Sequence, residues 1–412
     1  MKRLCFGRQP ADTRYRYHPG LPFSEGLPRS NDASYAAINR NFYLTSNKGN
    51  MLIGEGAARI FDCDRNYSAM LSVHVLYNHY QGSDDAIGWI NKNFDALVLP
   101  MANEIRPNLN HRSLVDALTE VKIPIVVLGM GMQNDLGPDM SELDPSTAEL
   151  LHLLDEKAHI FGVRGFYTEA WLRSQRLKKP VAMGCPSMML YPRNILSIKA
   201  PEGGAAGKRF MTAGYLTPQS RRGLQLARFF EGQDVSYVFQ DEIFAFKSEL
   251  ADRRFFNDAT NQLDPAALKP LMDAALGTDT PFRRYFHFDS VESWRQSYSW
   301  HDVFIGDRFH GAVAALQTGL PTAILHKDLR VKEMSEFFGI PNATMDEAHT
   351  MGLEAFMAKH LSTESIARFH QTYRERVRNF QSIAEAGGLR FVDRIEDDLL
   401  GAAPARELDL VA

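Results

Sequence analysis

The stretch Asp302–Pro321, DVFIGDRFHGAVAALQTGLP, decides the fold class of this chain. An apolar run ends at Gly306, a charged turn follows, and small apolar residues then continue as in a buried helix. A strand, a turn and a helix in this order form the repeating unit of parallel α/β sheets. The stretch therefore predicts an α/β protein with parallel sheets.

Apolar runs of strand length alternate with helical patterns through most of the chain. Continuous β-branched runs are typical of central parallel strands, which are buried on both faces. Small, flexible residues at Pro201–Gly207 interrupt both patterns and predict a linker between two α/β domains with a cleft between them. We expect strands at residues 42–45, 96–99, 124–128, 159–163 and 181–183 before the linker, and at 210–213, 235–239, 285–288, 303–305 and 322–325 after it.

The expected organisation has five parts. Residues 1–38 are rich in Arg, Pro, Gly, Ser and Asn and predict an N-terminal arm or long loop. Residues 39–200 and 208–362 are expected to form the two α/β domains. An apolar face from Ile366 to Ile383 predicts a long helix in a closing region at residues 363–400, and residues 401–412 are expected to be a flexible tail.

Composition narrows the function classes. The 412 residues include 46 basic and 50 acidic side chains, a net charge of −4, which argues against a nucleic-acid partner. The three cysteines, Cys5, Cys63 and Cys185, are odd in number and widely spaced, which excludes a disulfide framework or a zinc–cysteine site. The N-terminus predicts no secretory signal, and no apolar stretch is long enough to span a membrane. We expect a cytoplasmic protein and leave open a peripheral contact at the inner face of the membrane. Its oligomeric state cannot be read from the sequence.

Candidate site residues lie where strands run into turns, because ligands bind at the carboxyl ends of parallel strands. Arg308, His310 and Gly311 follow the strand that ends at Gly306. Gly311 would let an anion approach the N-terminus of a helix, and Arg308 offers a planar fork for phosphate or carboxylate. His310 can donate a proton near neutral pH. The alternative is an ordinary turn with a surface arginine and a capped histidine.

Other turns carry weaker signals. Gly129 and Gly131 predict either a close approach of the backbone to a ligand or a structural turn. Arg164 ends another expected strand and would suit a second anionic group, or would simply be solvated. The segment Asn47–Asn50 could bind a sugar hydroxyl or only turn the chain. The triplet Asp62–Asp64 is similar to a metal-binding DxD motif, but it falls at the end of an expected helix, so we expect no metal.

Taken in order, these segments resemble the polysaccharide pyruvyl transferase family. The stretch Asp302–Pro321 is similar to the family signature, in which Asp, an apolar pair and Gly precede x-Arg-x-His-Gly and an Ala-rich helix ending in Gly-x-Pro. The resemblance covers about residues 41–340 and includes Asn47-Lys48-Gly49-Asn50, Ala102-Asn103, Gly129-Met130-Gly131, Val163-Arg164-Gly165 and Gly184-Cys185-Pro186.

The resemblance implies the architecture of GT-B glycosyltransferases, with two Rossmann-like domains facing a cleft. It implies an enzyme that transfers a pyruvyl ketal from phosphoenolpyruvate to a sugar of a polysaccharide or lipid-linked precursor. By position, Arg308 and His310 would contact phosphoenolpyruvate, together with Gly311, Gly129 and Gly131. Arg164 would be a second anion-binding arginine, and Arg330 stands where the family commonly has a lysine. Asn47, Asn50 and Asn103 would lie on the acceptor side.

Two residues depart from the family pattern. Asn50 stands where many members have an aspartate, so it cannot act as a base toward a sugar hydroxyl. Phe309 replaces the usual leucine, which is a mild change. The N-terminal arm has no counterpart in the family pattern.

The implied reaction protonates the methylene carbon of phosphoenolpyruvate, and a sugar hydroxyl then attacks the central carbon. We expect His310 to be the general acid, or to bind the phosphate as an imidazolium and assist its departure. No cofactor is implied. Two alternatives stay open: a GT-B glycosyltransferase with a nucleotide-sugar donor, and a catalytically silent glycan-binding relative.

Overall fold

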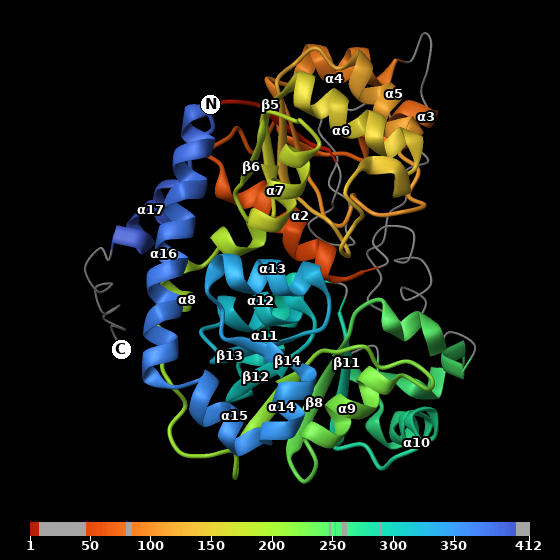
Figure 1. Cartoon of the computed structure of the whole chain (residues 1–412), viewed down its shortest axis with the longest axis vertical. Coiled ribbons are helices and arrows are strands. Elements are labelled where there is room, and N and C mark those ends of the chain that lie inside the picture. The colour runs from red at the N-terminus through yellow and green to blue at the C-terminus, as the bar shows by residue number, and fades with distance from the viewer. Residues whose placement is uncertain are drawn as a thin grey trace, which may run out of the picture.

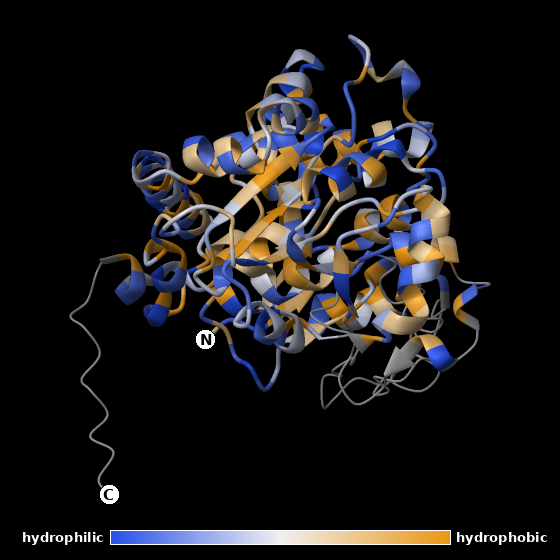
Figure 2. Ribbon diagram, turned by 90° about the horizontal axis from the view of Figure 1, so that it is seen from below, coloured by the Kyte–Doolittle hydropathy of each residue, from blue (hydrophilic) through white to orange (hydrophobic). Residues whose placement is uncertain are grey.

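The computed structural model describes residues 1–7, 47–79, 85–246, 249–251, 253–257, 262–288 and 290–400. Figure 1 shows two α/β halves stacked along the long axis, with a long helix beside both of them. Figure 2 shows that the strands in the interior are mostly hydrophobic, while the surrounding helices carry hydrophilic stretches. None of the helices in the described part of the chain has the length and apolar character that a membrane crossing requires.

The N-terminal half contains a parallel six-stranded sheet in the order β2-β1-β3-β4-β5-β6. This order reverses between β1 and β3, as in flavodoxin-like sheets. The strands are β1 (Leu4–Phe6), β2 (Ala69–Met70), β3 (Ala96–Pro100), β4 (Ile125–Met130), β5 (Ala158–Val163) and β6 (Pro180–Ala182).

The two faces of this sheet pack against different helices, because successive side chains of a strand point to opposite faces. Leu97 and Leu99 of β3 join a core made largely by α3 (Val73–His79), α4 (Ala86–Asn93), α5 (Arg112–Glu120) and α6 (Pro145–Lys157). Ala96 and Val98 join a second core with α2 (Gly49–Ile60), and this core continues without a break into the C-terminal half. The two halves therefore share apolar packing on the side of α2.

The C-terminal half contains an eight-stranded sheet in the order β14-β13-β12-β7-β8-β11-β10-β9. The six strands from β14 to β11 are parallel and have the Rossmann order, with the reversal between β7 and β12. The strands are β7 (Arg209–Thr212), β8 (Asp234–Phe239), β9 (Phe256–Asn257), β10 (Gln262–Leu263), β11 (Phe282–His287), β12 (Val303–Gly306), β13 (Thr322–His326) and β14 (Asn342–Thr344).

Helices connect these strands and cover the sheet. They are α9 (Arg221–Phe229), α10 (Pro265–Leu276), α11 (Val291–Tyr298), α12 (Phe309–Gln317), α13 (Leu329–Phe338), α14 (Met345–Met351) and α15 (Leu353–His360). In the N-terminal half, α7 (Phe166–Ser174) follows β5, and α8 (Pro192–Leu196) precedes the segment that leads to β7.

The long C-terminal helix α16 (Thr363–Ala386) touches both halves and is followed by α17 (Asp393–Leu400). Its Asn379 donates a hydrogen bond to the carbonyl of Ala182, while Arg376 donates to the carbonyl of Phe337. The hydroxyl of Tyr373 donates to the carbonyl of Met188 over 2.8 Å. Helix α16 thus fastens the N-terminal half to the C-terminal half.

Most of the expected strands are confirmed, but the sequence reading is wrong at the N-terminus. Residues 1–38 were expected to form an arm, whereas Leu4–Phe6 is a buried strand between β2 and β3. The first sheet therefore includes residues that precede the domain expected at 39–200. The second sheet was expected to be parallel, yet β10 pairs antiparallel with β9 and β11 at one edge. The strand expected at residues 42–45 and the tail at 401–412 lie outside the described residues.

Candidate functional site

A cavity of about 30 Å³ between the two halves brings together seven of the ten residues predicted for the site. The N-terminal half contributes residues at the start of α2 and after β3 and β5, and the C-terminal half contributes the starts of α12 and α13. The seven residues are Asn47, Asn50, Asn103, Arg164, Arg308, His310 and Arg330. We call this the arginine cavity, because it is lined by arginines that follow three different strands, β5, β12 and β13.

The three predicted glycines do not line the arginine cavity. A Cβ atom on Gly131 would lie 2.1 Å from Nε of Arg164, so this glycine leaves space for that side chain. Gly129 has a φ of +73°, which favours glycine, and its Cα faces Pro186. A Cβ on Gly311 would lie 2.8 Å from the Cβ of Ala213, so this glycine lets α12 approach β7. All three give the backbone or a neighbouring side chain the room it needs.

Arg308 lies at the reversal between β7 and β12, where ligands bind in open α/β sheets. Its Nε donates to the carbonyl of Gly214 over 2.9 Å, and its Nη2 contacts Asp241 at 2.5 Å and Glu242 at 2.8 Å. Its guanidinium also lies 5.1 Å from the ring centre of Tyr215. In the described part of the chain, Nη1 has no hydrogen-bond partner, so it is the group that Arg308 can offer to a ligand.

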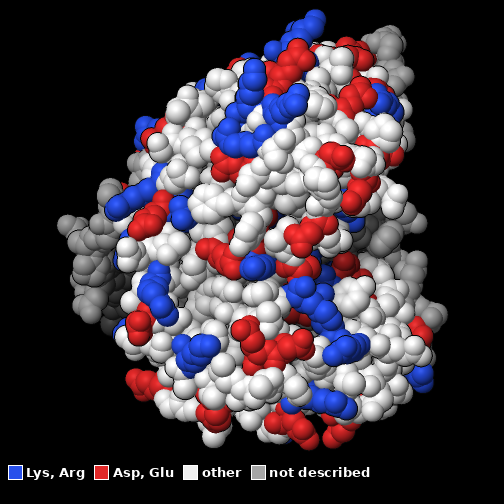
Figure 3. All heavy atoms as spheres, in the orientation of Figure 1, with Lys and Arg blue, Asp and Glu red and all other residues white. Residues whose placement is uncertain are grey.

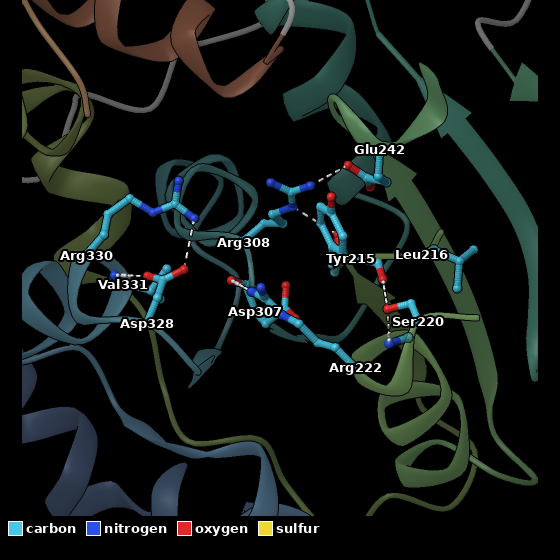
Figure 4. Close-up of polar contacts among 12 residues, drawn as sticks. Tyr215, Leu216, Ser220, Arg222, Glu242, Asp307, Arg308, Asp328, Arg330 and Val331 are labelled. Carbon is cyan, nitrogen blue, oxygen red and sulfur yellow. Dashed lines mark hydrogen bonds and ion pairs between the residues drawn. The ribbon is translucent and has the colours of Figure 1, made fainter. Parts of the chain in front are cut away.

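Figure 4 shows that the Arg308 guanidinium lies between Glu242 on one side and Arg330 on the other. Burial would lower the pKa of Arg308, but Glu242, Asp241 and Asp307 more than offset this effect, so the pKa is raised. Burial also raises the pKa of Glu242 to about 7, against the opposing charge of Arg308. Arg308 therefore stays charged although it is only 5% exposed.

The other two arginines come from turns in different halves. Arg164 is 3% exposed, and its Nη1 donates to Oδ1 of Asn103 over 2.7 Å. Its Nε is buried without a hydrogen-bond partner among the described residues. Burial lowers its pKa to about 10, and Arg330 adds to this effect while Glu333 opposes it. Arg330 contacts Asp328 at 3.2 Å, and burial likewise lowers its pKa.

His310 lies in the first turn of α12, with its imidazole facing the arginine cavity. Burial lowers its pKa to about 3, and the charges of Arg164 and Arg330 act in the same direction. The imidazole is therefore neutral at neutral pH. An anion bound between these arginines would offset their charge and raise the pKa of His310.

Two helices from opposite halves begin at the arginine cavity. Helix α2 begins at Gly49, whose backbone N–H donates to Oδ1 of Asn47 over 3.0 Å. Helix α12 begins at Phe309, and its N-cap residue Arg308 makes no side-chain capping hydrogen bond. A Cβ on Gly49 would lie 2.8 Å from the Cβ of His310, so the start of α2 packs directly on this histidine. The partial positive charge of both N-termini adds to that of the arginines. The arginine cavity thus has a positively charged lining, which favours an anion.

The sequence analysis did not predict several residues that line the arginine cavity or contact its side chains. Cys185 lies with its Sγ 3.5 Å from Nε2 of His310 and 3.0 Å from Oγ of Ser187. Gln240, at the end of β8, lines the arginine cavity with its Nε2 buried and unpaired among the described residues. Both follow strand ends, which is the signal that could have found them. Asp241 and Glu242, which pair with Arg308, belong to no motif that the sequence shows.

Asp307 is a further buried carboxylate behind the site. Its Oδ2 pairs with Arg222 of α9, and its Oδ1 has no partner among the described residues. The described ranges contain no group of three or more His, Cys, Asp or Glu side chains placed to hold a metal ion. The carboxylates near Arg308 form ion pairs with arginines: Asp241 and Glu242 with Arg308, and Asp307 with Arg222.

Comparison with known proteins gives one match to a family model. The model described as polysaccharide pyruvyl transferase matches residues 47–325, which include every residue of the site except Arg330 and Met334. No curated protein matches the chain.

Several solved structures are similar in fold. A trehalose 6-phosphate synthase from Burkholderia multivorans is 11% identical over 97% of this chain and 99% of its own, with a TM-score of 0.45. HepE of Anabaena in complex with UDP is 11% identical over 73% of this chain and 80% of its own, with a TM-score of 0.42. A variant of the wall teichoic acid polymerase TagF is 12% identical over 81% of this chain and 78% of its own, with a TM-score of 0.35.

Proposed function

This chain belongs to the polysaccharide pyruvyl transferase family, and we propose that it transfers a pyruvyl group from phosphoenolpyruvate to a sugar of a polysaccharide or lipid-linked glycan precursor. The observation that carries the proposal is the arginine cavity, where Arg164, Arg308 and Arg330 surround His310. Phosphoenolpyruvate has a carboxylate and a phosphate, so it needs several cations within a small volume. A nucleotide-sugar donor would need, in addition, a site for its base.

Different arginines would bind the two anionic groups of the donor. Arg308 and Arg330 would hold one anionic group. Both come from the C-terminal half, in which the strand order reverses between β7 and β12. Arg164 comes from the opposite half and would hold the other. Charge-assisted hydrogen bonds of this kind are roughly twice as strong as neutral ones. Because the cations come from both halves, donor binding would also hold the halves together.

His310 supplies the proton. The bound anion raises its pKa, so the imidazole takes up a proton and donates it to the methylene carbon of phosphoenolpyruvate. A sugar hydroxyl then forms a bond to the central carbon and gives its proton to the now neutral imidazole. The bond between this carbon and the phosphate oxygen breaks, a second hydroxyl closes the ketal ring, and its proton leaves with the phosphate.

This sequence of proton transfers accounts for Asn50. A carboxylate at this position is not needed as a base, because His310 is neutral after it has protonated the donor. Asn50, Asn47 and Asn103 line the same cavity and can hydrogen-bond the hydroxyls of the sugar. The proposed reaction involves neither a metal nor a cofactor.

We also propose a cytoplasmic location. Cys5, Cys63 and Cys185 are free and buried, which is usual in a reducing compartment. Figure 3 shows acidic and basic side chains interspersed over one face, in keeping with the near-neutral net charge.

The proposed donor can be tested by ligand-induced thermal stabilisation of the full chain. Phosphoenolpyruvate should raise the melting temperature in a concentration-dependent way, since a ligand that binds only the folded state stabilises it. UDP-glucose and other nucleotide sugars should have little effect. Stabilisation by a nucleotide sugar without any effect of phosphoenolpyruvate would contradict the proposal.

Arg308→Lys is expected to raise the KM for phosphoenolpyruvate by roughly 10–100-fold, the value of a hydrogen bond to a charged group. Lysine keeps the positive charge but lacks the Nε that donates to Gly214 and the second Nη that faces the cavity. Initial rates of phosphate release at varied phosphoenolpyruvate concentrations measure the effect. Arg222→Lys, which changes an arginine outside the cavity lining, is the matched comparison. An unchanged KM in Arg308→Lys would remove this residue from the donor site.

Cys185→Ala is expected to lower kcat by roughly 2–10-fold, since one weak hydrogen bond is worth about 0.5–1.5 kcal/mol. Burial raises the pKa of the Cys185 thiol, so the thiol stays protonated and its contact with Nε2 orients the His310 ring. The pH dependence of kcat should shift in Cys185→Ala and be partly restored in Cys185→Ser. A change in KM alone, with the pH profile intact, would show that Cys185 does not act through His310.

A further inference from the structure

A second cavity, of about 480 Å³, opens beside the arginine cavity between α7 and the start of α13. We call it the α7 cavity. The ion pair between Asp328 and Arg330 separates the two cavities, because Asp328 lines the α7 cavity and Arg330 lines the arginine cavity. On the opposite side, Met132 lines the α7 cavity while Gly131 packs on Arg164. A ligand in the α7 cavity would therefore lie next to the reacting groups.

Two aromatic side chains form one wall of the α7 cavity. Tyr167 and Trp171 are four residues apart on α7, so they project from the same face of the helix. The indole Nε1 of Trp171 donates to the carbonyl of Gly137 over 3.0 Å, and the hydroxyl of Tyr167 donates to Glu336 over 2.7 Å. The rings are thus held in place before any ligand arrives, although Tyr167 is 40% exposed.

The remaining polar lining carries both signs of charge. Asp135 and Asp328 can accept hydrogen bonds from hydroxyl groups, and Lys327 and Lys332 can donate them. Lys332 also lies 5.7 Å from the ring centre of Tyr167, so it covers part of that ring. Trp171, which is partly buried, is the other aromatic ring of the lining. A flat apolar ring beside donors and acceptors of both signs suits a neutral polyhydroxy ligand, whose ring C–H groups stack and whose hydroxyls bond.

Another cavity of the same size lacks this chemistry. It lies near the segment that joins the two halves and has a volume of about 480 Å³. Among the described residues that line it, Glu354 is the one charged side chain and none is aromatic. Volume alone does not single out the α7 cavity; the aromatic platform and its position beside Arg330 do.

We propose that the α7 cavity binds the sugar units of the acceptor that adjoin the unit being modified. This inference rests on the proposed function, since it assumes a glycan acceptor whose reacting hydroxyls reach His310. The reacting sugar would lie at the arginine cavity, and its neighbours in the chain would stack on Trp171. The two halves would then each contribute to acceptor binding, α7 from one and the start of α13 from the other.

Direct binding of sugars tests the proposal without any need for turnover. The probes are the methyl glycosides of glucose, galactose and mannose, titrated into the full chain and followed by saturation-transfer NMR and by tryptophan fluorescence. At least one glycoside should bind the wild type saturably. Trp171→Ala should weaken that binding about 10-fold, as expected for removal of a central tryptophan contact. Trp171→Phe, which keeps a stacking ring, should retain most of it.

The matched control is Trp300→Ala. Trp300 is another of the four tryptophans, is 57% exposed, and does not line the α7 cavity. Its loss should leave glycoside binding unchanged. Thermal stabilisation by phosphoenolpyruvate should be the same in wild type, Trp171→Ala and Trp300→Ala, which also shows that the variants fold.

Three results would overturn the proposal: no glycoside binds the wild type, Trp171→Ala binds glycosides as tightly as the wild type, or UDP displaces the glycoside. These results are separable from failure of the proposed function. If phosphoenolpyruvate does not bind the wild type, the donor is wrong, whereas the glycoside titration still decides whether the α7 cavity binds sugars.

Discussion

Replacement of His310 by glutamine should lower kcat for phosphate release by roughly 10²–10⁴-fold, the range that a positioned general acid contributes. Glutamine can still hydrogen-bond a phosphate, but it cannot donate a proton to carbon or take one from a sugar hydroxyl. Because Arg164, Arg308 and Arg330 are unchanged, phosphoenolpyruvate should still bind, so the loss should fall on kcat and spare KM.

Proton uptake separates the role of His310 from that of the donor phosphate. Titration of phosphoenolpyruvate in buffers of different ionisation enthalpy should show a net proton uptake in the wild type. The pKa of His310 is about 3 without a ligand, and a bound anion is expected to raise it. His310→Gln should lack this part of the uptake. Near-normal turnover in His310→Gln, or the same proton uptake as the wild type, would refute both roles given to the histidine.

Glu55→Ala should lower the free energy of unfolding by about 3–5 kcal/mol, the cost of leaving a buried charge without its partner. Glu55 of α2 pairs with Arg295 of α11 through two contacts of 2.6 and 2.8 Å. The two side chains are 3% and 10% exposed. This ion pair joins the two halves, and its loss should also widen the gap between the start of α2 and His310.

Denaturant unfolding monitored by circular dichroism gives the free energy. The matched control is Glu149→Ala, which breaks a pair with Arg112 whose side chains are about half exposed, at 49% and 48%. Loss of an exposed pair should cost about 0–1 kcal/mol. If Glu55→Ala and Glu149→Ala had equal effects, the buried pair would not be what holds the halves together.

The sequence predicted that Arg164, Arg308 and His310 lie close together, and they line one cavity. This prediction was possible because it depends on local pattern. Arg308 and His310 directly follow an apolar run that ends in Gly306, and Arg164 directly follows another. In parallel sheets the carboxyl ends of all strands lie at one edge, so residues after different strands converge. The alternation of strands and helices fixes which residues these are. The convergence on one cavity therefore followed from the fold class.

A position after a strand end marks Cys185 as a candidate. Which side chains pair with one another could not be predicted, because the pairing is set by contacts between distant segments. Asp241 and Glu242 follow β8 and meet Arg308 across more than 60 residues of sequence. Cys185 meets His310 across 125 residues. The local pattern of apolar residues does not predict either contact.

The error at the N-terminus has a similar cause. Strand β1 is only three residues long, and it is stabilised by pairing with β2 and β3 on either side. Three apolar residues beside a polar stretch are too few for a period to be recognised. Gly311 and Gly129 illustrate the same limit, since a glycine needed for close packing looks like one needed for a ligand until the neighbours are known.

The central claim is that the chain transfers pyruvyl groups from phosphoenolpyruvate to a glycan. For the most direct measurement, the full chain is incubated with phosphoenolpyruvate, nucleotide sugars and a pool of oligosaccharide acceptors. Mass spectrometry then follows the masses of the acceptors, and the released inorganic phosphate is measured in parallel. We predict that an acceptor gains the mass of pyruvic acid less one water, which is the pyruvyl ketal, with release of one phosphate for each ketal formed. Gain of a whole sugar unit from a nucleotide sugar, with phosphoenolpyruvate unconsumed, would contradict it.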